Sequence, residues 1–231
     1  MGSTGFYLYC IGGADHPAPG DVTGIGGAPV QALALDGLVG WVSPMEAAPG
    51  ASLQRVREHN DVVERACAER TALPLRFGQW FPGERALGAE IHDRRAALED
   101  GLRRVDGAME MGVRILDPEQ RDDPPDRSTG RAYLETLARR DARMAAAAGR
   151  GRTVAAELRE WLGPLVRDER VRPLGTSAGL AAAAHLVDRH DIGTYTSRVR
   201  SFAARRGELR FLFSGPWPPY GFADDQRQES A

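Results

Sequence analysis

The segment Gly215-Pro216-Trp217-Pro218-Pro219-Tyr220-Gly221-Phe222 closes the folded part of this 231-residue chain. An alternating apolar run, Leu209-Arg210-Phe211-Leu212-Phe213, precedes it and predicts a strand. Three prolines fix φ and remove three backbone donors, so we expect a stiff, extended arm that is neither helix nor central strand. Its three aromatic rings either pack on the body of the protein or present an aromatic surface to a partner. Residues 223–231 are polar and are expected to form a disordered tail.

Working outward from that strand, the second half of the chain alternates strand and helix patterns. The expected elements are a strand at 109–116, a helix at 131–148 that resumes at 153–165, strands at 166–174 and 180–187, and a helix at 191–206. Gly149-Arg150-Gly151 is expected to break or bend the first of these helices. With the strand at 209–213, the order is β-α-β-β-α-β, which is that of a modified ferredoxin-like domain with a long broken first helix.

The first half of the chain predicts a different arrangement. An apolar run at 6–11 predicts a buried strand, and Asp36-Gly37 predicts a two-residue hairpin turn between strands at 30–35 and 38–43. Ser52 is the expected N-cap of a first helix, and apolar residues recur at helical spacing over 84–105. We therefore predict an α+β fold with an N-terminal domain at 1–107, a C-terminal ferredoxin-like domain with its arm at 108–222, and a tail at 223–231. A single mixed sheet is the alternative.

Composition excludes several classes of function. The net charge is −2 and all 30 basic residues are arginine, so electrostatics give no case for binding nucleic acid or an anionic membrane. No apolar run approaches the roughly 20 residues of a membrane helix. The two cysteines, Cys10 and Cys67, make no disulfide framework. These features favour a cytoplasmic protein.

Catalytic and cofactor motifs are weak. Gly175-Thr176-Ser177-Ala178-Gly179 matches the serine hydrolase string G-x-S-x-G, and Asp188 and His190 follow it. However, the turn is expected to join two strands, whereas a hydrolase places it between a strand and a helix. The glycine-rich stretch at 12–29, a long loop that we expect to be mobile, lacks a phosphate-binding motif. Histidine spacing predicts no metal site. We expect no catalytic, cofactor-binding or metal-binding residues.

The stretch Leu73-Pro74-Leu75-Arg76-Phe77-Gly78 is short, apolar and interrupted by proline. It predicts an edge strand or an extended buried segment. Arg76 stands between apolar residues, so its guanidinium must find acceptors in carbonyls, a carboxylate or a partner.

Several motifs along the chain together resemble the GvpF/GvpL family of gas vesicle proteins. The most specific are Leu73-Pro74-Leu75-Arg76-Phe77-Gly78 and Gly215-Pro216-Trp217-Pro218-Pro219-Tyr220 with Phe222. The others are Gly5-Phe6-Tyr7-Leu8-Tyr9, His59 with Val63, Glu110-Met111-Gly112-Val113-Arg114, Gly130-Arg131-Ala132-Tyr133-Leu134 and Leu186-Val187-Asp188. Gly221 departs from the family pattern, which usually has a larger polar residue there.

The resemblance implies a non-enzymatic protein of the cytoplasm and the gas vesicle. It would be a minor structural component or an assembly factor, with the small hydrophobic shell protein GvpA and other accessory gas vesicle proteins as partners. A lipid membrane and nucleic acid are not expected partners. The alternatives are a small-molecule-binding regulatory domain or a serine hydrolase that uses Ser177.

The family motifs give the candidate interaction residues. They are Arg76, Phe77, Gly78, Trp217, Pro218, Pro219, Tyr220 and Phe222. We expect Trp217 and Tyr220 to dock across the junction of the two domains, with Arg76-Phe77 as the receiving segment. A fully buried Trp217 would contribute about 3–5 kcal/mol to stability.

Overall fold

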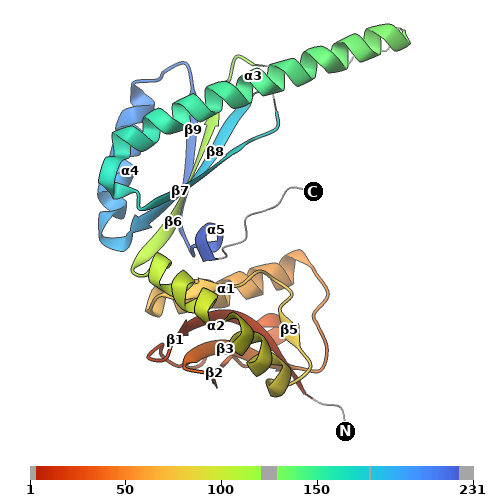
Figure 1. Cartoon of the computed structure of the whole chain (residues 1–231), viewed down its shortest axis with the longest axis vertical. Helices are drawn as coiled ribbons and strands as arrows, with labels where there is room; N and C mark the ends of the chain where they lie inside the picture. The colour runs from red at the N-terminus through yellow and green to blue at the C-terminus, as the bar shows by residue number, and fades with distance from the viewer. Residues whose placement is uncertain (1–3, 121–128, 177, 224–231) are drawn as a thin grey trace. The chain divides into compact units, whose positions relative to one another are not determined.

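The computed structural model describes residues 4–120, 129–176 and 178–223. Contacts divide the chain into two compact units (Figure 1). The first comprises Met1–Met109 with Trp217–Ala231, and the second comprises Glu110–Pro216. The segment from Trp217 onward therefore groups with the first unit, whereas the sequence assigned it to the C-terminal domain.

The first unit is a five-stranded sheet with helices. Its strands follow the order β2-β3-β1-β4, and β5 also pairs with β1. The elements are β1 (Gly5–Gly13), a 3-10 turn η1 (Ile25–Gly27), β2 (Gln31–Leu35), β3 (Leu38–Met45), α1 (Leu53–Glu69), β4 (Ala72–Pro74), β5 (Trp80–Phe81), α2 (Glu84–Val105) and α5 (Tyr220–Ala223).

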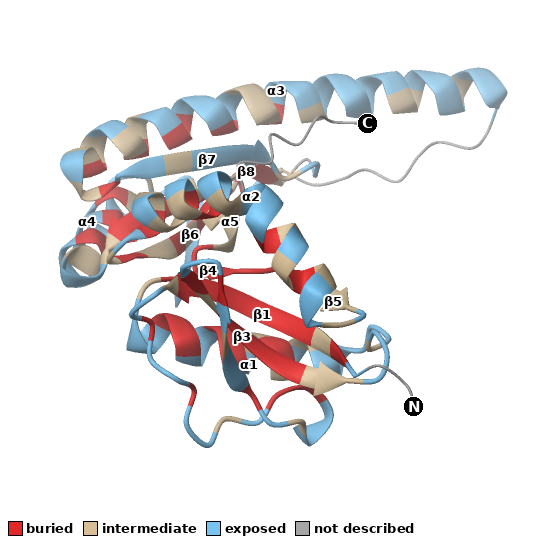
Figure 2. Cartoon of the chain, turned by 60° about the horizontal axis from the view of Figure 1, so that its bottom comes forward, coloured by how far each residue is buried: buried red, intermediate tan, exposed pale blue. Residues whose placement is uncertain are grey.

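Local chemistry accounts for these elements. The central strand β1 is apolar on both faces and is buried along most of its length (Figure 2). Asp36 and Gly37 both have positive φ, 48° and 84°, which is the geometry of the predicted hairpin turn between β2 and β3. Ser52 caps α1 as predicted, since its side chain accepts from the Arg55 N–H at 3.2 Å.

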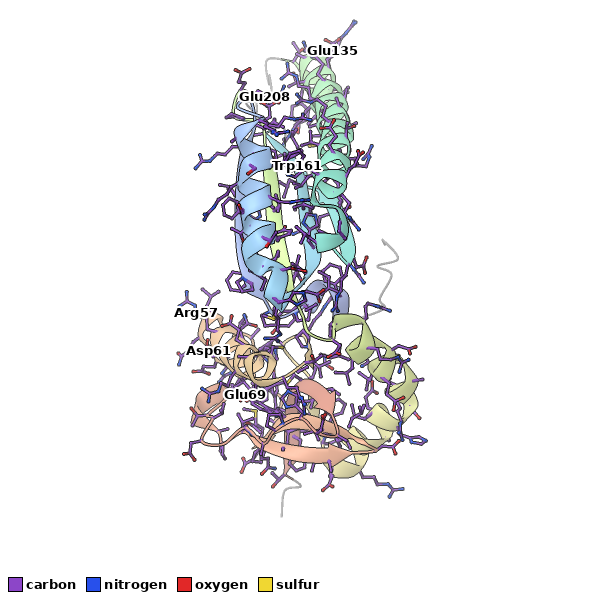
Figure 3. All side chains as sticks on the ribbon, turned by 90° about the vertical axis from the view of Figure 1, so that its left-hand side faces the viewer. Arg57, Asp61, Glu69, Glu135, Trp161 and Glu208 are labelled. Atoms are coloured by element: carbon purple, nitrogen blue, oxygen red, sulfur yellow. The ribbon has the colours of Figure 1, made fainter. Side chains whose placement is uncertain are left out.

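The second unit is a four-stranded sheet in the order β7-β8-β6-β9. Its helices α3 and α4 both cover one face of that sheet (Figure 1). Trp161 of α3 is labelled in Figure 3. Its indole N–H donates to the Arg198 carbonyl of α4 at 3.2 Å. The elements are β6 (Ala108–Leu116), α3 (Gly130–Leu162), η2 (Gly163–Leu165), β7 (Asp168–Pro173), β8 (Gly179–Asp188), η3 (Arg189–Asp191), α4 (Ile192–Ala204) and β9 (Arg210–Trp217).

The prediction that the first helix of this unit is broken is wrong. Helix α3 runs unbroken for 33 residues, and its N-terminal half extends beyond the sheet (Figure 1). Gly151 lies inside it because β8 comes very close. A Cβ at this position would lie 2.3 Å from the Leu180 carbonyl oxygen. Gly151 thus permits close packing of helix on strand and does not interrupt the helix.

The expected proline-rich arm also differs in the structure. Strand β9 continues through Pro216 to Trp217, and Tyr220 begins the short helix α5. Proline is tolerated in β9 because this strand lies at the edge of its sheet. Ala223 belongs to α5, and the rest of the predicted tail, 224–231, lies outside the described residues.

Candidate functional site

A buried polar and aromatic cluster joins β1 to α1 in the first unit. The Tyr7 hydroxyl lies 3.0 Å from His59 Nδ1, and His59 Nε2 lies 2.9 Å from the Leu75 carbonyl oxygen. The Gly78 N–H donates to the Tyr7 hydroxyl at 3.0 Å. Phe77 completes the cluster, with its ring 5.9 Å from both Tyr7 and His59.

The hydrogen bonds of this cluster fix the tautomer of His59. A carbonyl can only accept, so Nε2 carries the proton and Nδ1 accepts from the Tyr7 hydroxyl. Burial lowers the pKa of His59, and the hydrogen bond to Leu75 opposes that shift only in part. Burial likewise raises the pKa of Tyr7. Both side chains are therefore neutral near pH 7, and the segment after β4 is held to α1 by neutral hydrogen bonds.

Acid should destabilise the protein through His59. Its pKa is lowered in the folded state, so between the unfolded value of 6.5 and the folded value the unfolded chain binds more protons. Stability is present above pH 6.5 and falls as the pH drops through this window, by up to about 1.4 kcal/mol per pH unit. We expect urea unfolding at several pH values to show a shallower acid dependence for His59→Asn.

The exposed His190 provides the matched control for this measurement, since 79% of its side chain is accessible. His190→Asn should keep the wild-type acid dependence. An identical dependence in His59→Asn and wild type would contradict the buried, neutral assignment of His59.

Hydrogen bonds anchor the glycine-rich loop before β2 to strands β1 and β3. The Tyr9 hydroxyl accepts from the Ile25 N–H at 3.0 Å and lies 3.0 Å from Ser43 Oγ. Ser43 in turn donates to the Pro29 carbonyl at 2.9 Å. A Cβ on Gly24 would lie 2.0 Å from the Tyr9 hydroxyl, so glycine is what lets the loop approach this ring. The sequence predicted a long mobile loop here, but hydrogen bonds anchor its middle and its end.

A second group of hydrogen-bonded polar side chains lies in the second unit. His185 of β8 is fully buried, with Nδ1 2.6 Å from the Tyr195 hydroxyl of α4 and Nε2 2.9 Å from Glu169 Oε1 of β7. Burial, with the nearby Glu169 carboxylate, raises the pKa of Tyr195. Sequence reasoning missed this hydrogen-bonded group because it depends on the cross-strand register, which places Glu169 opposite His185.

The structure separates the predicted interaction residues by accessibility. Arg76 and Gly78 are exposed, so solvent can also supply the acceptors that the Arg76 guanidinium was expected to find in carbonyls, a carboxylate or a partner. Trp217 is 46% exposed, so the full burial on which its larger expected contribution to stability depends is not met.

The other predicted residues are more enclosed. Pro218 and Pro219 are buried, and Phe222 is fully buried. Tyr220 is half-buried and donates to Asn60 Oδ1 of α1 at 2.9 Å. Tyr220 and the half-buried Phe77 pack against the same apolar core of the first unit.

The residues of the serine hydrolase string and of a possible metal site lie in the second unit. Ser177 lies outside the described residues, and its turn connects the antiparallel strands β7 and β8, not a strand and a helix. Asp188, His190 and Asp191 place ligand atoms within 4.8 Å of one another. Asp188 is already paired with Arg167. Within the described ranges, no helix has the length and apolar character to cross a membrane.

Comparisons with known proteins agree along the whole chain. The family model of gas vesicle synthesis protein GvpL/GvpF matches residues 5–224. Gas vesicle protein F1 of Halobacterium salinarum is 27% identical over 209 residues, which cover 88% of this chain and 86% of that protein. Gas vesicle protein F of a Streptomyces species is 27% identical over 236 residues, covering 94% and 99%.

Solved structures show the same fold. GvpF from an Anabaena species superposes with a TM-score of 0.75 at 21% identity, covering 99% of this chain and 100% of that chain. GvpF from Microcystis aeruginosa gives 0.73 at 20% identity, covering 95% and 99%. With the family model matching nearly every residue, the resemblance drawn from the motifs is confirmed, and the chain belongs to the gas vesicle synthesis protein GvpL/GvpF family.

Proposed function

We propose that this chain is a non-enzymatic accessory protein of gas vesicle formation, a minor component or assembly factor that binds the small hydrophobic shell protein GvpA and limits its aggregation. Family membership over residues 5–224 supports a gas vesicle role. The relatives carry the names gas vesicle protein F and gas vesicle protein L. The role places the protein in the cytoplasm and at the gas vesicle, among other accessory gas vesicle proteins.

The physical need for such a factor follows from the shell itself. A protein that lines a gas-filled space must present apolar surface, and exposed apolar surface associates without order before assembly. A factor that covers this surface, or that templates its ordered packing, keeps the shell protein available for assembly into the vesicle wall. An exposed strand edge can do so by pairing with a strand of the partner.

The observation that carries the proposal is the exposure of strand β9. Its residues from Leu212 to Trp217 are all exposed, and they include Leu212 at 42%, Phe213 at 39% and Trp217 at 46%. Strand β9 also ends the sheet order, so in the described part of the chain no strand covers its outer edge. Proteins normally protect such edges with charge or cover, so an apolar one supports a binding role.

Among the predicted interaction residues, accessibility supports three as contact positions. Arg76, Gly78 and Trp217 are exposed and can meet a partner directly. Pro218, Pro219 and Phe222 are buried, so we assign them a structural role. We also infer that the second unit is a modified ferredoxin-like module, which its strand order β7-β8-β6-β9 supports.

The test is the effect of this protein on the aggregation of purified shell protein, followed by sedimentation. We expect the wild type to keep more shell protein in the supernatant and Phe213→Glu to do so much less well. Glutamate at this position keeps a folded-state partner, because the Arg200 guanidinium lies 5.5 Å from the Phe213 ring centre.

The matched control is Leu134→Glu on α3, where the side chain is 65% exposed. This variant makes the same kind of change at an accessible apolar position away from β9 and should behave as the wild type. If Phe213→Glu protects the shell protein as well as the wild type does, strand β9 is not the binding edge.

A further inference from the structure

The exposed part of β9 presents different side chains on its two faces. The Phe211 ring lies 5.7 Å from that of Phe202 in α4. The Arg200 guanidinium of the same helix lies 5.5 Å from the Phe213 ring centre. Phe211 and Phe213 therefore point toward the helices, and Leu212 between them points to the opposite face, because side chains alternate along a strand. A partner at the outer edge of β9 would meet both Phe213 and Leu212, which are 39% and 42% exposed.

Arg200 brings a positive charge to this edge. The residue is exposed. In the described part of the chain, its guanidinium contacts the Phe213 ring but forms no ion pair or hydrogen bond. A guanidinium stays charged at any physiological pH and carries several N–H donors in a fixed planar arrangement. These donors are therefore available to an acceptor on a partner.

The surroundings of Arg200 supply no compensating negative charge. Helix α4 and strand β9, both described along their full length, contain no aspartate or glutamate. On the helical face, the neighbouring strand β6 contributes buried apolar side chains such as Met111 and Val113. Glu208, in the turn before β9, lies 3.9 Å from Arg206. The charge of Arg200 therefore favours an anionic partner.

Strand geometry says where the negative charge of such a partner would lie. A strand that pairs with the outer edge of β9 would lie about 4.8 Å from it, and directly opposite residues would point to the same face. The residue opposite Phe213 would then lie on the helical face, beside Arg200. Its neighbours along the partner strand would point to the other face, beside Leu212. A carboxylate at the first position and apolar side chains at the others would match this edge.

The same charges argue against two other occupants. A second copy of this chain, paired through the same edge, would bring two α4–β9 surfaces together that both carry arginine and lack acids. Nucleic acid has the charge but no strand backbone to pair with the edge, and the net charge of −2 does not attract it.

We propose that the β9 edge selects an acidic partner strand, whose carboxylate binds Arg200 beside Phe213 while its apolar neighbours cover Leu212. This inference rests on the proposed function, since it concerns the same edge, and it adds the charge pattern that the partner strand must have.

The test uses the full chain and three labelled peptides of alternating valine and threonine. They differ only in the central residue, which is glutamate, glutamine or lysine. An oligothymidylate is the fourth probe. Fluorescence anisotropy at several salt concentrations reports the affinities, and sedimentation of the free protein reports its oligomeric state.

We expect the wild type to bind the glutamate peptide about fivefold or more tightly than the glutamine peptide, with the difference shrinking as salt rises. Arg200→Gln should bind both peptides equally. Arg200→Lys keeps the charge and should keep the preference, whereas Arg200→Glu should favour the lysine peptide. The matched control is Arg140→Gln on α3, which removes the charge of another exposed arginine and should behave as the wild type.

The outcomes separate this inference from the proposed function. Equal affinity for the glutamate and glutamine peptides, with both weakened in Phe213→Glu, would overturn the inference and leave β9 as a binding edge. Peptide binding that is absent, or unchanged in Phe213→Glu, would overturn it and also count against β9 as the edge of the proposed function. Tighter binding of the oligothymidylate than of the glutamate peptide would overturn it in favour of nucleic acid. A dimer that Phe213→Glu disperses would overturn it in favour of a second copy.

Discussion

Replacing Phe222 by alanine is expected to lower the free energy of unfolding by about 3–5 kcal/mol, although this residue lies almost at the end of the described chain. Its side chain is fully buried. The helix that carries it, α5, packs against α2 and β4, where the Ala223 carbonyl lies 3.2 Å from the Cβ position of Gly101. Truncating the ring would leave a cavity in the first unit. Urea unfolding of the purified variant measures the loss.

Trp217→Ala is the matched variant for Phe222→Ala, because Trp217 is an aromatic residue of the same C-terminal segment but is much more exposed. The indole is 46% exposed, so its removal should cost less than that of the Phe222 ring, about 1–3 kcal/mol. The sequence predicted a loss of about 3–5 kcal/mol for Trp217→Ala only if the Trp217 ring were fully buried. If Trp217→Ala proves more destabilising than Phe222→Ala, the account of how the C-terminal segment packs is wrong.

The second large effect concerns two glycines of α3 that are two residues apart. Gly151→Ala is expected to destabilise the protein by about 1–3 kcal/mol, because its Cβ would meet the backbone of Leu180 in β8 at 2.3 Å. Gly149→Ala is expected to stabilise it by about 0.5–1 kcal/mol, since a Cβ there meets nothing within 4 Å and alanine favours the helix.

Thermal unfolding followed by circular dichroism distinguishes the two substitutions directly. The melting temperature should fall for Gly151→Ala and rise for Gly149→Ala. Shifts of the same sign in both variants would mean that helix propensity alone decides these positions and that the close approach of β8 has no energetic consequence.

These glycines also show where sequence reasoning stops. Local signals were sufficient for the Asp36-Gly37 turn, the Ser52 cap and the buried face of α2, because each depends on neighbours within one element. Whether Gly151 breaks a helix depends on β8, which lies about 30 residues further along the chain. Its local pattern therefore predicted a break that the packing removes.

The Tyr7–His59 cluster and the Glu169–His185–Tyr195 group could not be predicted either, because they too depend on contacts between residues distant in the sequence. Tyr7 and His59 are 52 residues apart, and their contact exists only because α1 packs on β1. Glu169 and His185 meet through the β7–β8 register. The motif around Arg76 was found from the sequence, but its separation into an exposed guanidinium and a half-buried Phe77 required the fold.

The most direct test of the proposed role is a count of gas vesicles by electron microscopy in a strain from which this gene has been deleted. The proposal predicts few or no vesicles in the deletion strain, recovery with the wild-type gene and with Leu134→Glu, and poor recovery with Phe213→Glu although that protein accumulates and folds. Normal vesicle numbers in the deletion strain would contradict the proposed function outright.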